Sequence, residues 1–106
     1  PPGGVAAPSY PGVEDPEKLL KFARELCEFY RSSSQARLPV EDLQGLMQDA
    51  TRLFAQEETL VKIEVPTGEH INVVGDVHGQ LFDFLSIFEA NGWPSEDNRF
   101  LFNGDF

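Results

Sequence analysis

The stretch 71-INVVGDVHGQLFDF-84 decides the fold, because a short apolar strand pattern leads directly into a Gly-Asp corner and then into helical spacing. The apolar residues after the corner recur at three- and four-residue intervals; they are Leu81, Phe84, Leu85 and Phe88. Asn91 and Gly92 end this helical pattern, and a second apolar strand pattern covers residues 99–103. A crossover of this length returns the second strand parallel to the first. The sequence therefore predicts a strand-helix-strand unit over residues 71–103.

Two acidic residues lie at the carboxyl ends of the two predicted strands. Asp76 and Asp105 are each preceded by glycine, and His78 opens the loop before the helix. Open α/β sheets place their ligands at this edge. If the strands are neighbours, about 5 Å apart, the two carboxylates repel each other unless a cation lies between them. Carboxylate oxygens combined with an imidazole nitrogen suit manganese, iron or zinc better than calcium. The sequence therefore predicts a metal site formed by Asp76, His78 and Asp105.

A simpler interpretation gives the first aspartate a purely structural role. An aspartate after a strand commonly caps the helix that follows, and Asp76 stands in such a place. His78 and the second Gly-Asp argue against that interpretation, since the pattern G-D-x-H-G arises by chance on the order of once in 10⁵ positions. Dinucleotide binding is excluded because no G-x-G-x-x-G follows the strand.

Two amphipathic helices are expected in the first half of the chain. Residues 1–14 contain four prolines and three glycines and are predicted to be a linker. Asp15 and Pro16 form a helix start, and this helix is expected to end near 31-RSSS-34. Its apolar face consists of Leu19, Phe22, Ala23, Leu26, Phe29 and Tyr30.

The second helix is expected to begin around Pro39, with the acidic residues Glu41 and Asp42 in its first turn. Its apolar face consists of Leu43, Leu46, Met47, Ala50, Leu53 and Phe54. We expect the apolar faces of both helices to belong to the core.

Between the helices and the α/β unit, the apolar period changes from helical to alternating. The run 60-LVKIEVPTGEHINVV-74 alternates on both sides of Pro66, Thr67 and Gly68, which predicts a β-hairpin. His70 then lies near the hairpin tip, where we expect a solvated loop residue.

Composition narrows the classes of function. The chain has 106 residues, 41% of them hydrophobic, which is enough for one domain. Its formal net charge of -10 excludes nucleic acids and anionic membranes as expected partners. No apolar window approaches the ~20 residues of a membrane span, and no signal-peptide pattern is present. The single cysteine, Cys27, cannot form an internal disulfide and is expected to pack, so we expect a cytoplasmic or nuclear protein.

The Gly-Asp segments carry a family resemblance. The runs 75-GDVHGQ-80 and 104-GDF-106 resemble the first two signature motifs, G-D-x-H-G and G-D-x-V-D-R-G, of the metal-dependent phosphoprotein serine/threonine phosphatases (PPP family). The segment 91-NGWPSEDNRFLFNGDF-106 is most similar to one subgroup of that family. Val74 stands where cysteine is frequent in the family, and Trp93 where leucine is usual. The resemblance covers residues 60–106 and extends more loosely over residues 9–59.

This resemblance implies an α/β fold, the metallophosphatase-like (calcineurin-like phosphoesterase) sandwich. Only its N-terminal portion would be present: two lead-in helices, a hairpin and the strand-helix-strand unit. In terms of domains, residues 1–14 would be a linker and residues 15–106 the N-terminal part of the catalytic domain.

The resemblance also implies a chemistry. Asp76 and His78 would bind the first metal, and Asp105 would bridge the first and the second. The two divalent ions would be manganese, iron or zinc, and the family hydrolyses phosphoserine and phosphothreonine esters of phosphoproteins with a metal-activated water. In the most similar subgroup, a helical repeat domain on the N-terminal side binds chaperone tails, so a chaperone or regulatory partner is implied as well.

Other parts of the family's site have no counterpart in this sequence. The arginine that binds the phosphate, the aspartate that orients the proton donor and the later G-N-H-E motif are missing. No catalytic residue beyond the metal ligands is therefore assigned. We expect the chain to be inactive alone and to expose apolar surface and an open sheet edge beside its last strand.

Two alternative functions remain. Dinucleoside polyphosphate hydrolases share G-D-x-H-G, although 91-NGWPSE-96 and 102-FNGDF-106 argue against them. The other alternative is a non-catalytic module that binds a regulator or partner through residues 16–57.

Overall fold

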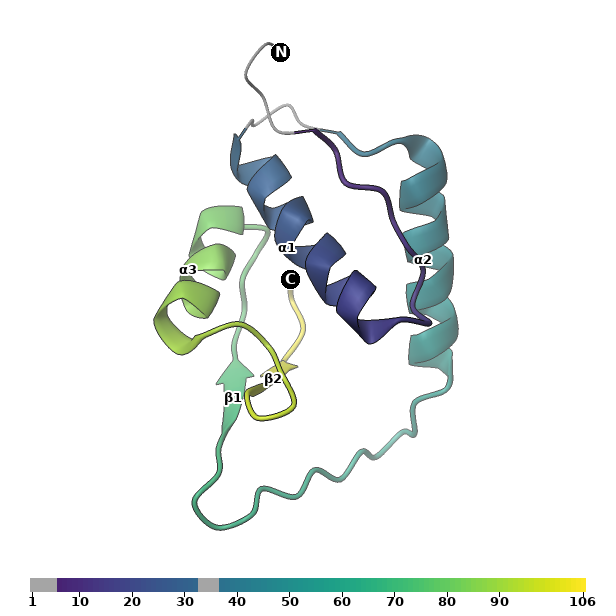
Figure 1. The fold of residues 1–106 in the computed structure, drawn as a ribbon. Coiled ribbons are helices and arrows are strands. Elements are labelled where there is room, and N and C mark those ends of the chain that lie inside the picture. Colours follow the sequence, from purple (N-terminus) through teal and green to yellow (C-terminus); the bar gives the residue numbers. More distant parts are fainter. Residues whose placement is uncertain (1–5, 33–36) are drawn as a thin grey trace. The chain divides into compact units, whose positions relative to one another are not determined.

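The computed structural model describes residues 6–32 and 37–106. In chain order its elements are α1 (Pro16–Ser32), α2 (Val40–Ala55), β1 (Ile71–Val74), α3 (Leu81–Asn91) and β2 (Arg99–Phe102) (Figure 1). The chain divides into two compact units, Pro1–Val61 and Lys62–Phe106, which we call the N-terminal and the C-terminal unit. In the part of the chain that the structure describes, no helix combines the length and the apolar character that a membrane crossing requires.

The first helix, α1, forms as predicted and begins at its proline. The Asp15 Oδ1 atom accepts hydrogen bonds from the backbone N–H groups of Glu17 (3.0 Å) and Lys18 (3.3 Å), which are free of partners inside the helix. Phe22 and Phe29 on the apolar face are buried. Cys27 is half-buried in the same helix, and this burial raises the pKa of its thiol, which fits a packing role. Residues 33–36, where the helix end was also expected, lie outside the described residues.

The second helix, α2, also forms as predicted, with Pro39 as its N-cap residue. The expectation that its apolar face joins the core is wrong, because α2 contains no buried residue among those described. Met47 and Phe54 are 60% and 75% exposed. The spacing of these residues indicated an amphipathic helix correctly, but spacing alone does not supply a partner surface in the same chain.

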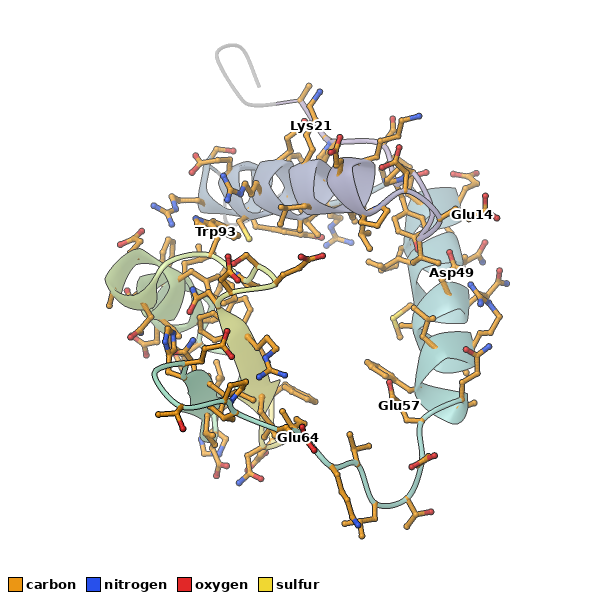
Figure 2. All side chains as sticks on the ribbon, turned by 60° about the horizontal axis from the view of Figure 1, so that its bottom comes forward. Glu14, Lys21, Asp49, Glu57, Glu64 and Trp93 are labelled. Carbon is orange, nitrogen blue, oxygen red and sulfur yellow. The ribbon has the colours of Figure 1, made fainter. Side chains whose placement is uncertain are left out.

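Part of the predicted linker is bound to α2 through Tyr10. The Tyr10 hydroxyl donates a 2.7 Å hydrogen bond to Asp49 Oδ2, and its backbone N–H donates one of 3.3 Å to Asp42 Oδ2. Figure 2 labels Asp49 on α2. The ring meets Phe22 of α1 edge-on, with the centroids 5.3 Å apart. A Cβ atom on Gly45 would lie 3.4 Å from the Tyr10 ring, an ordinary van der Waals contact, so the ring packs over this residue. Residues 6–12 thus form no helix or strand but still contact the helices.

The predicted hairpin is wrong. Only Ile71–Val74 forms a strand, and residues 61–66 are extended without a strand partner. A turn does occur at its expected place, with the Glu69 N–H donating to the Pro66 carbonyl at 3.0 Å. Alternating apolar residues fit any pleated neighbour, and β1 pairs with β2 instead.

The C-terminal unit contains the predicted strand-helix-strand arrangement. The strands β1 and β2 are parallel neighbours, in a register that runs from Ile71 opposite Arg99 to Val74 opposite Phe102. Figure 1 shows α3 beside this pair of strands. The Phe88 ring of α3 packs against Phe102 with the centroids 6.4 Å apart, and Leu85 is the most deeply buried side chain. Aromatic packing on one face of the sheet is therefore the core of this unit.

The Asn98 side chain closes the loop between α3 and β2. Its amide nitrogen donates to the carbonyls of Asn91 (2.9 Å) and Trp93 (3.0 Å), the latter labelled in Figure 2. Its carbonyl oxygen accepts a 2.8 Å bond from Asn72 Nδ2 in β1 and lies 3.0 Å from His70 Nε2. His70 is exposed, as expected, although it precedes β1 instead of lying in a hairpin. Asn98 therefore connects the starts of both strands.

The Leu85→Ala substitution tests the core of the C-terminal unit. Leu85 is 2% exposed, so its truncation leaves a cavity in a packed interior. We expect the free energy of unfolding to fall by about 2–5 kcal/mol. Urea unfolding followed by circular dichroism measures it. Phe82→Ala is the matched control on the same helix, because Phe82 is 65% exposed and its truncation should change stability by no more than about 0.5 kcal/mol. Equal losses in the two variants would contradict this core.

The hydrogen bond between Tyr10 and Asp49 predicts that the free energy of unfolding depends on pH in the alkaline range. Partial burial, followed by the hydrogen bond to Asp49, raises the pKa of Tyr10 to about 12. The pKa of Tyr10 in the folded chain lies above the ordinary value of ~10. The contact therefore stabilises the fold fully below pH ~10, and this stabilisation is lost as the pH rises through ~12. The difference in unfolding free energy between the unaltered chain and Tyr10→Phe should therefore stay constant from neutral pH to about pH 10 and then shrink. A difference that does not shrink would contradict the assignment.

Candidate metal centre

The two loops that follow the strands are joined by backbone hydrogen bonds. Asn103 N–H donates to the Val74 carbonyl at 2.9 Å, which extends the parallel pairing beyond the last strand residues. Further along, the N–H groups of Val77 (3.2 Å) and His78 (3.1 Å) both donate to the carbonyl of Asp105. The Gly79 N–H donates to the Phe106 carbonyl. The loop after β1 is thus bound directly to the loop after β2.

Two of the predicted ligands adopt an unusual backbone conformation. His78 and Asp105 both have φ of 55°, in the left-handed region that L-residues with a side chain seldom adopt. Such residues cost about 1–3 kcal/mol each and persist only where the surroundings hold them. The hydrogen bonds at the Asp105 carbonyl provide that restraint. Strain of this kind is common at functional sites, which makes these two residues candidates for one.

The side chains of Asp76, His78 and Asp105 converge as predicted. His78 Nε2 lies 2.9 Å from Asp105 Oδ2 and 3.4 Å from Asp76 Oδ2. One ligand atom from each residue lies within 4.8 Å of the others. All three side chains are exposed to solvent, between 53% and 68%. The structure therefore brings together all three residues that the sequence singled out.

The purely structural interpretation of Asp76 does not hold. The N-cap residue of α3 is Gln80, and no side chain makes a capping hydrogen bond there. Asp76 Oδ2 lies 3.4 Å from His78 Nε2. Asp76 therefore does not cap α3, and its role as a metal ligand stays a prediction.

The donor set fits a transition-metal ion. Two carboxylates and one imidazole are ligands that manganese, iron and zinc all accept, whereas a calcium site would use oxygen alone. Within residues 6–32 and 37–106, this is the one group of three or more His, Cys, Asp or Glu side chains arranged closely enough to hold an ion. Even a four-coordinate site takes one ligand more than this group provides. The cluster is therefore suited to part of a metal site that other groups complete.

An apolar pocket of about 300 Å³ adjoins the cluster, and no pattern in the sequence predicted it. Its lining residues are Val77, Gly79, Gln80, Leu81, Phe84 and Phe106. Two lining residues, Val77 and Gly79, flank His78 in the loop after β1. A third, Phe106, directly follows Asp105. Phe84 is part of the predicted helical spacing, whereas the position of Phe106 depends on the pairing between the two loops. No local pattern carries that information.

Comparison with known proteins gives consistent relatives. No protein-family profile matches the chain. The chain is 41% identical to serine/threonine-protein phosphatase 5 of Arabidopsis thaliana over 105 residues, which is 97% of the chain and 19% of that protein. It is 38% identical to the human protein of the same name over 98 residues, 92% of the chain and 19% of the relative. It is 56% identical to serine/threonine-protein phosphatase T of Aspergillus oryzae over 99 residues, 92% of the chain and 20% of the relative.

These matches agree with the subgroup suggested by residues 91–106, which is phosphatase 5. They also extend the similarity over the region of α1 and α2, where the motifs alone gave a looser likeness. The chain spans about a fifth of the length of the curated relatives it matches. Over 92–97% of its length the chain is therefore similar to serine/threonine-protein phosphatases of the PPP family, of the phosphatase 5 and phosphatase T kind.

Proposed function

We propose that this chain contributes the first metal ligands of a protein serine/threonine phosphatase, an enzyme that hydrolyses phosphoserine and phosphothreonine esters. The observation that carries the proposal is the convergence of Asp76, His78 and Asp105 at the carboxyl ends of two parallel strands. The names of the relatives support the same activity and phosphoproteins as substrates. They disfavour the dinucleoside polyphosphate alternative.

Asp76 and His78 would hold the first of two divalent ions, and Asp105 would be shared between both. When bound, such ions lower the pKa of a coordinated water toward ~7 and stabilise negative charge on the phosphoryl oxygens. Manganese, iron and zinc all remain compatible with the donor set. The chain's own contribution would be to hold three ligands together in the loops that follow β1 and β2 before an ion binds.

The backbone bonds between the two loops are central to that contribution. Because the Val77 and His78 N–H groups both donate to the Asp105 carbonyl, the imidazole and the second carboxylate cannot drift apart independently. A ligand set fixed in this way loses less conformational entropy on binding than one on free loops. The same bonds hold both residues in the left-handed conformation that aims them at each other.

Turnover itself would belong to the whole protein. No arginine for the phosphate and no proton donor can be assigned next to the triad by resemblance, so the chain alone would bind metal weakly and turn over no substrate. We also propose a cytoplasmic or nuclear location, because the chain is acidic and has only one cysteine. A chaperone or regulatory partner would act through parts of the whole protein outside this chain.

Manganese binding tests the assignment of the three ligands. Calorimetric titration of the chain with Mn²⁺ should give one site, and Asp76→Asn, His78→Ala or Asp105→Asn should each weaken it at least about tenfold, because each removes a donor from an incomplete site. The matched control is His70→Ala, which removes the other histidine, bound to Asn98 and outside the triad. Equal affinity in all variants, or a loss with His70→Ala alone, would show that the ion binds elsewhere.

A phosphate-release assay tests whether hydrolysis requires the whole protein. With a phosphothreonine peptide and Mn²⁺, the 106-residue chain should release no phosphate above the blank, because its site lacks groups that bind and protonate the substrate. In the whole protein, Asp105→Asn should lower kcat by about a hundredfold or more. Turnover by the isolated chain that disappears with Asp76→Asn would disprove the inactivity while confirming the site.

A further inference from the structure

A hollow of about 340 Å³ lies between residues 9–11 and the first turns of α1, inside the N-terminal unit. We call it the lysine pocket, because two of the eight basic residues of this acidic chain line it. Phe22 is buried and gives the pocket an apolar part. The lining residues are Ser9, Pro11, Lys18, Lys21, Phe22 and Glu25. Positive charge is therefore concentrated at one place on a chain whose formal charge is -10.

Ser9 brings an exposed hydroxyl to this pocket. Among the described residues, the hydroxyl has no hydrogen-bond partner. The chain on either side of it is held in place, because Pro8 is buried and the Tyr10 hydroxyl donates a 2.7 Å hydrogen bond to Asp49. Residues 6–12 form no helix or strand, so a kinase could reach the serine without unfolding an element. A group attached to Ser9 Oγ would remain next to the two lysines.

We propose that Ser9 is a phosphorylation site and that Lys18 and Lys21 bind the phosphate. A protein kinase would transfer the γ-phosphoryl group of ATP to Ser9. The bond between Ser9 Oγ and phosphorus forms, the bond from phosphorus to the β,γ-bridging oxygen breaks, ADP leaves and the hydroxyl proton passes to solvent. The bound phosphate then fixes residues 6–12 to α1. None of this requires the metal centre or turnover, so phosphate binding goes beyond the proposed function.

The charges in the lysine pocket suit a phosphate monoester. Phosphoserine carries a charge of about -1.5 to -2 at neutral pH and three acceptor oxygens. Lys18 and Lys21 each offer three donors on a flexible stem. Lys21, labelled in Figure 2, lies 3.7 Å from Glu25, but the two side chains are 80% and 46% exposed. Such a pair contributes little, so the Lys21 ammonium can turn to a phosphate at small cost.

A phosphate on the neighbouring residue would have the opposite effect. The Tyr10 hydroxyl and N–H both bond to carboxylates, those of Asp49 and Asp42. A phosphate on Tyr10 would therefore meet negative charge and would detach residues 6–12 from α2. The same group thus stabilises the bound segment from position 9 and releases it from position 10. This contrast separates binding by the lysine pocket from a general effect of added charge.

Hydrogen exchange at the Tyr10 amide tests the proposal. This N–H donates to Asp42 Oδ2, so its exchange rate reports how often residues 6–12 detach. Phosphoserine would be introduced at position 9 of the 106-residue chain during translation, and exchange followed by NMR with a chelator present. A peptide of residues 6–15 with the same phosphate corrects for the intrinsic rate. We expect exchange to slow about fivefold, as two partly exposed ion pairs would produce.

Substitutions of the lysines identify the phosphate-binding groups. Lys18→Gln and Lys21→Gln should each remove part of the slowing, and together they should abolish it. Without the phosphate, the same substitutions should change the exchange rate less than about twofold. The matched control is Arg37→Gln, which also removes one positive charge but lies outside the lysine pocket and should leave the slowing unchanged. Circular dichroism of each variant shows whether its helices remain.

Three results would overturn the proposal. They are exchange that is unchanged or faster with phosphoserine at position 9, slowing that survives loss of both lysines, and the absence of Ser9 phosphate from the whole protein isolated from its own cells with phosphatase inhibitors. Phosphotyrosine at position 10 should speed the exchange of the neighbouring amides, and slowing there would also count against it. A failure of the metal proposal would leave all these rates unchanged, because the chelator removes divalent ions throughout.

Discussion

The parallel register of β1 and β2 is the constraint on which the candidate site depends. Because Val74 is paired with Phe102, the Gly-Asp corners that follow the two strands start at the same level of the sheet. A shift by one residue would turn Val74 from the core toward solvent and would move Asp105 by about 3.3 Å relative to Asp76. Such a displacement exceeds the tolerance of a metal-ligand distance. The convergence of Asp76, His78 and Asp105 is therefore a consequence of strand pairing more than of any individual loop.

Two sets of contacts maintain that register from opposite ends of the strands. At the start, the Asn98 side chain bonds to Asn72 in β1 while it closes the loop that leads into β2. At the end, the Asp105 carbonyl accepts the N–H groups of Val77 and His78. The aromatic packing between α3 and Phe102 lies between these contacts and resists slippage, because it fits only one alternation of side chains. Strain at His78 and Asp105 can persist because the surrounding unit is fixed on both sides.

Local patterns were sufficient to predict most elements and all three members of the cluster. The cap at Asp15, the spacing of Leu81, Phe84 and Leu85, and the Gly-Asp corners are short-range signals, and strand-end geometry brings their carboxylates together. The failures share a different cause. The exposure of the α2 face, the missing hairpin at residues 61–66 and the docking of Tyr10 on Asp49 all depend on which surface is available as a partner. Periodicity reports that a surface is apolar without reporting what lies against it.

The same distinction bears on function. The position of each ligand in the cluster is determined within the C-terminal unit, by backbone bonds that need no other polypeptide. The metal affinity and the chemistry of the cluster are not determined within this unit. The three side chains are more than half exposed, so their charges interact through solvent of high dielectric constant. Covering this edge would strengthen the attraction between a cation and the two carboxylates, and would raise the cost of leaving them without one. Metal binding and burial of the sheet edge should therefore favour each other. The local fold determines the geometry of the three side chains, and the covering of the edge determines how strongly they bind an ion.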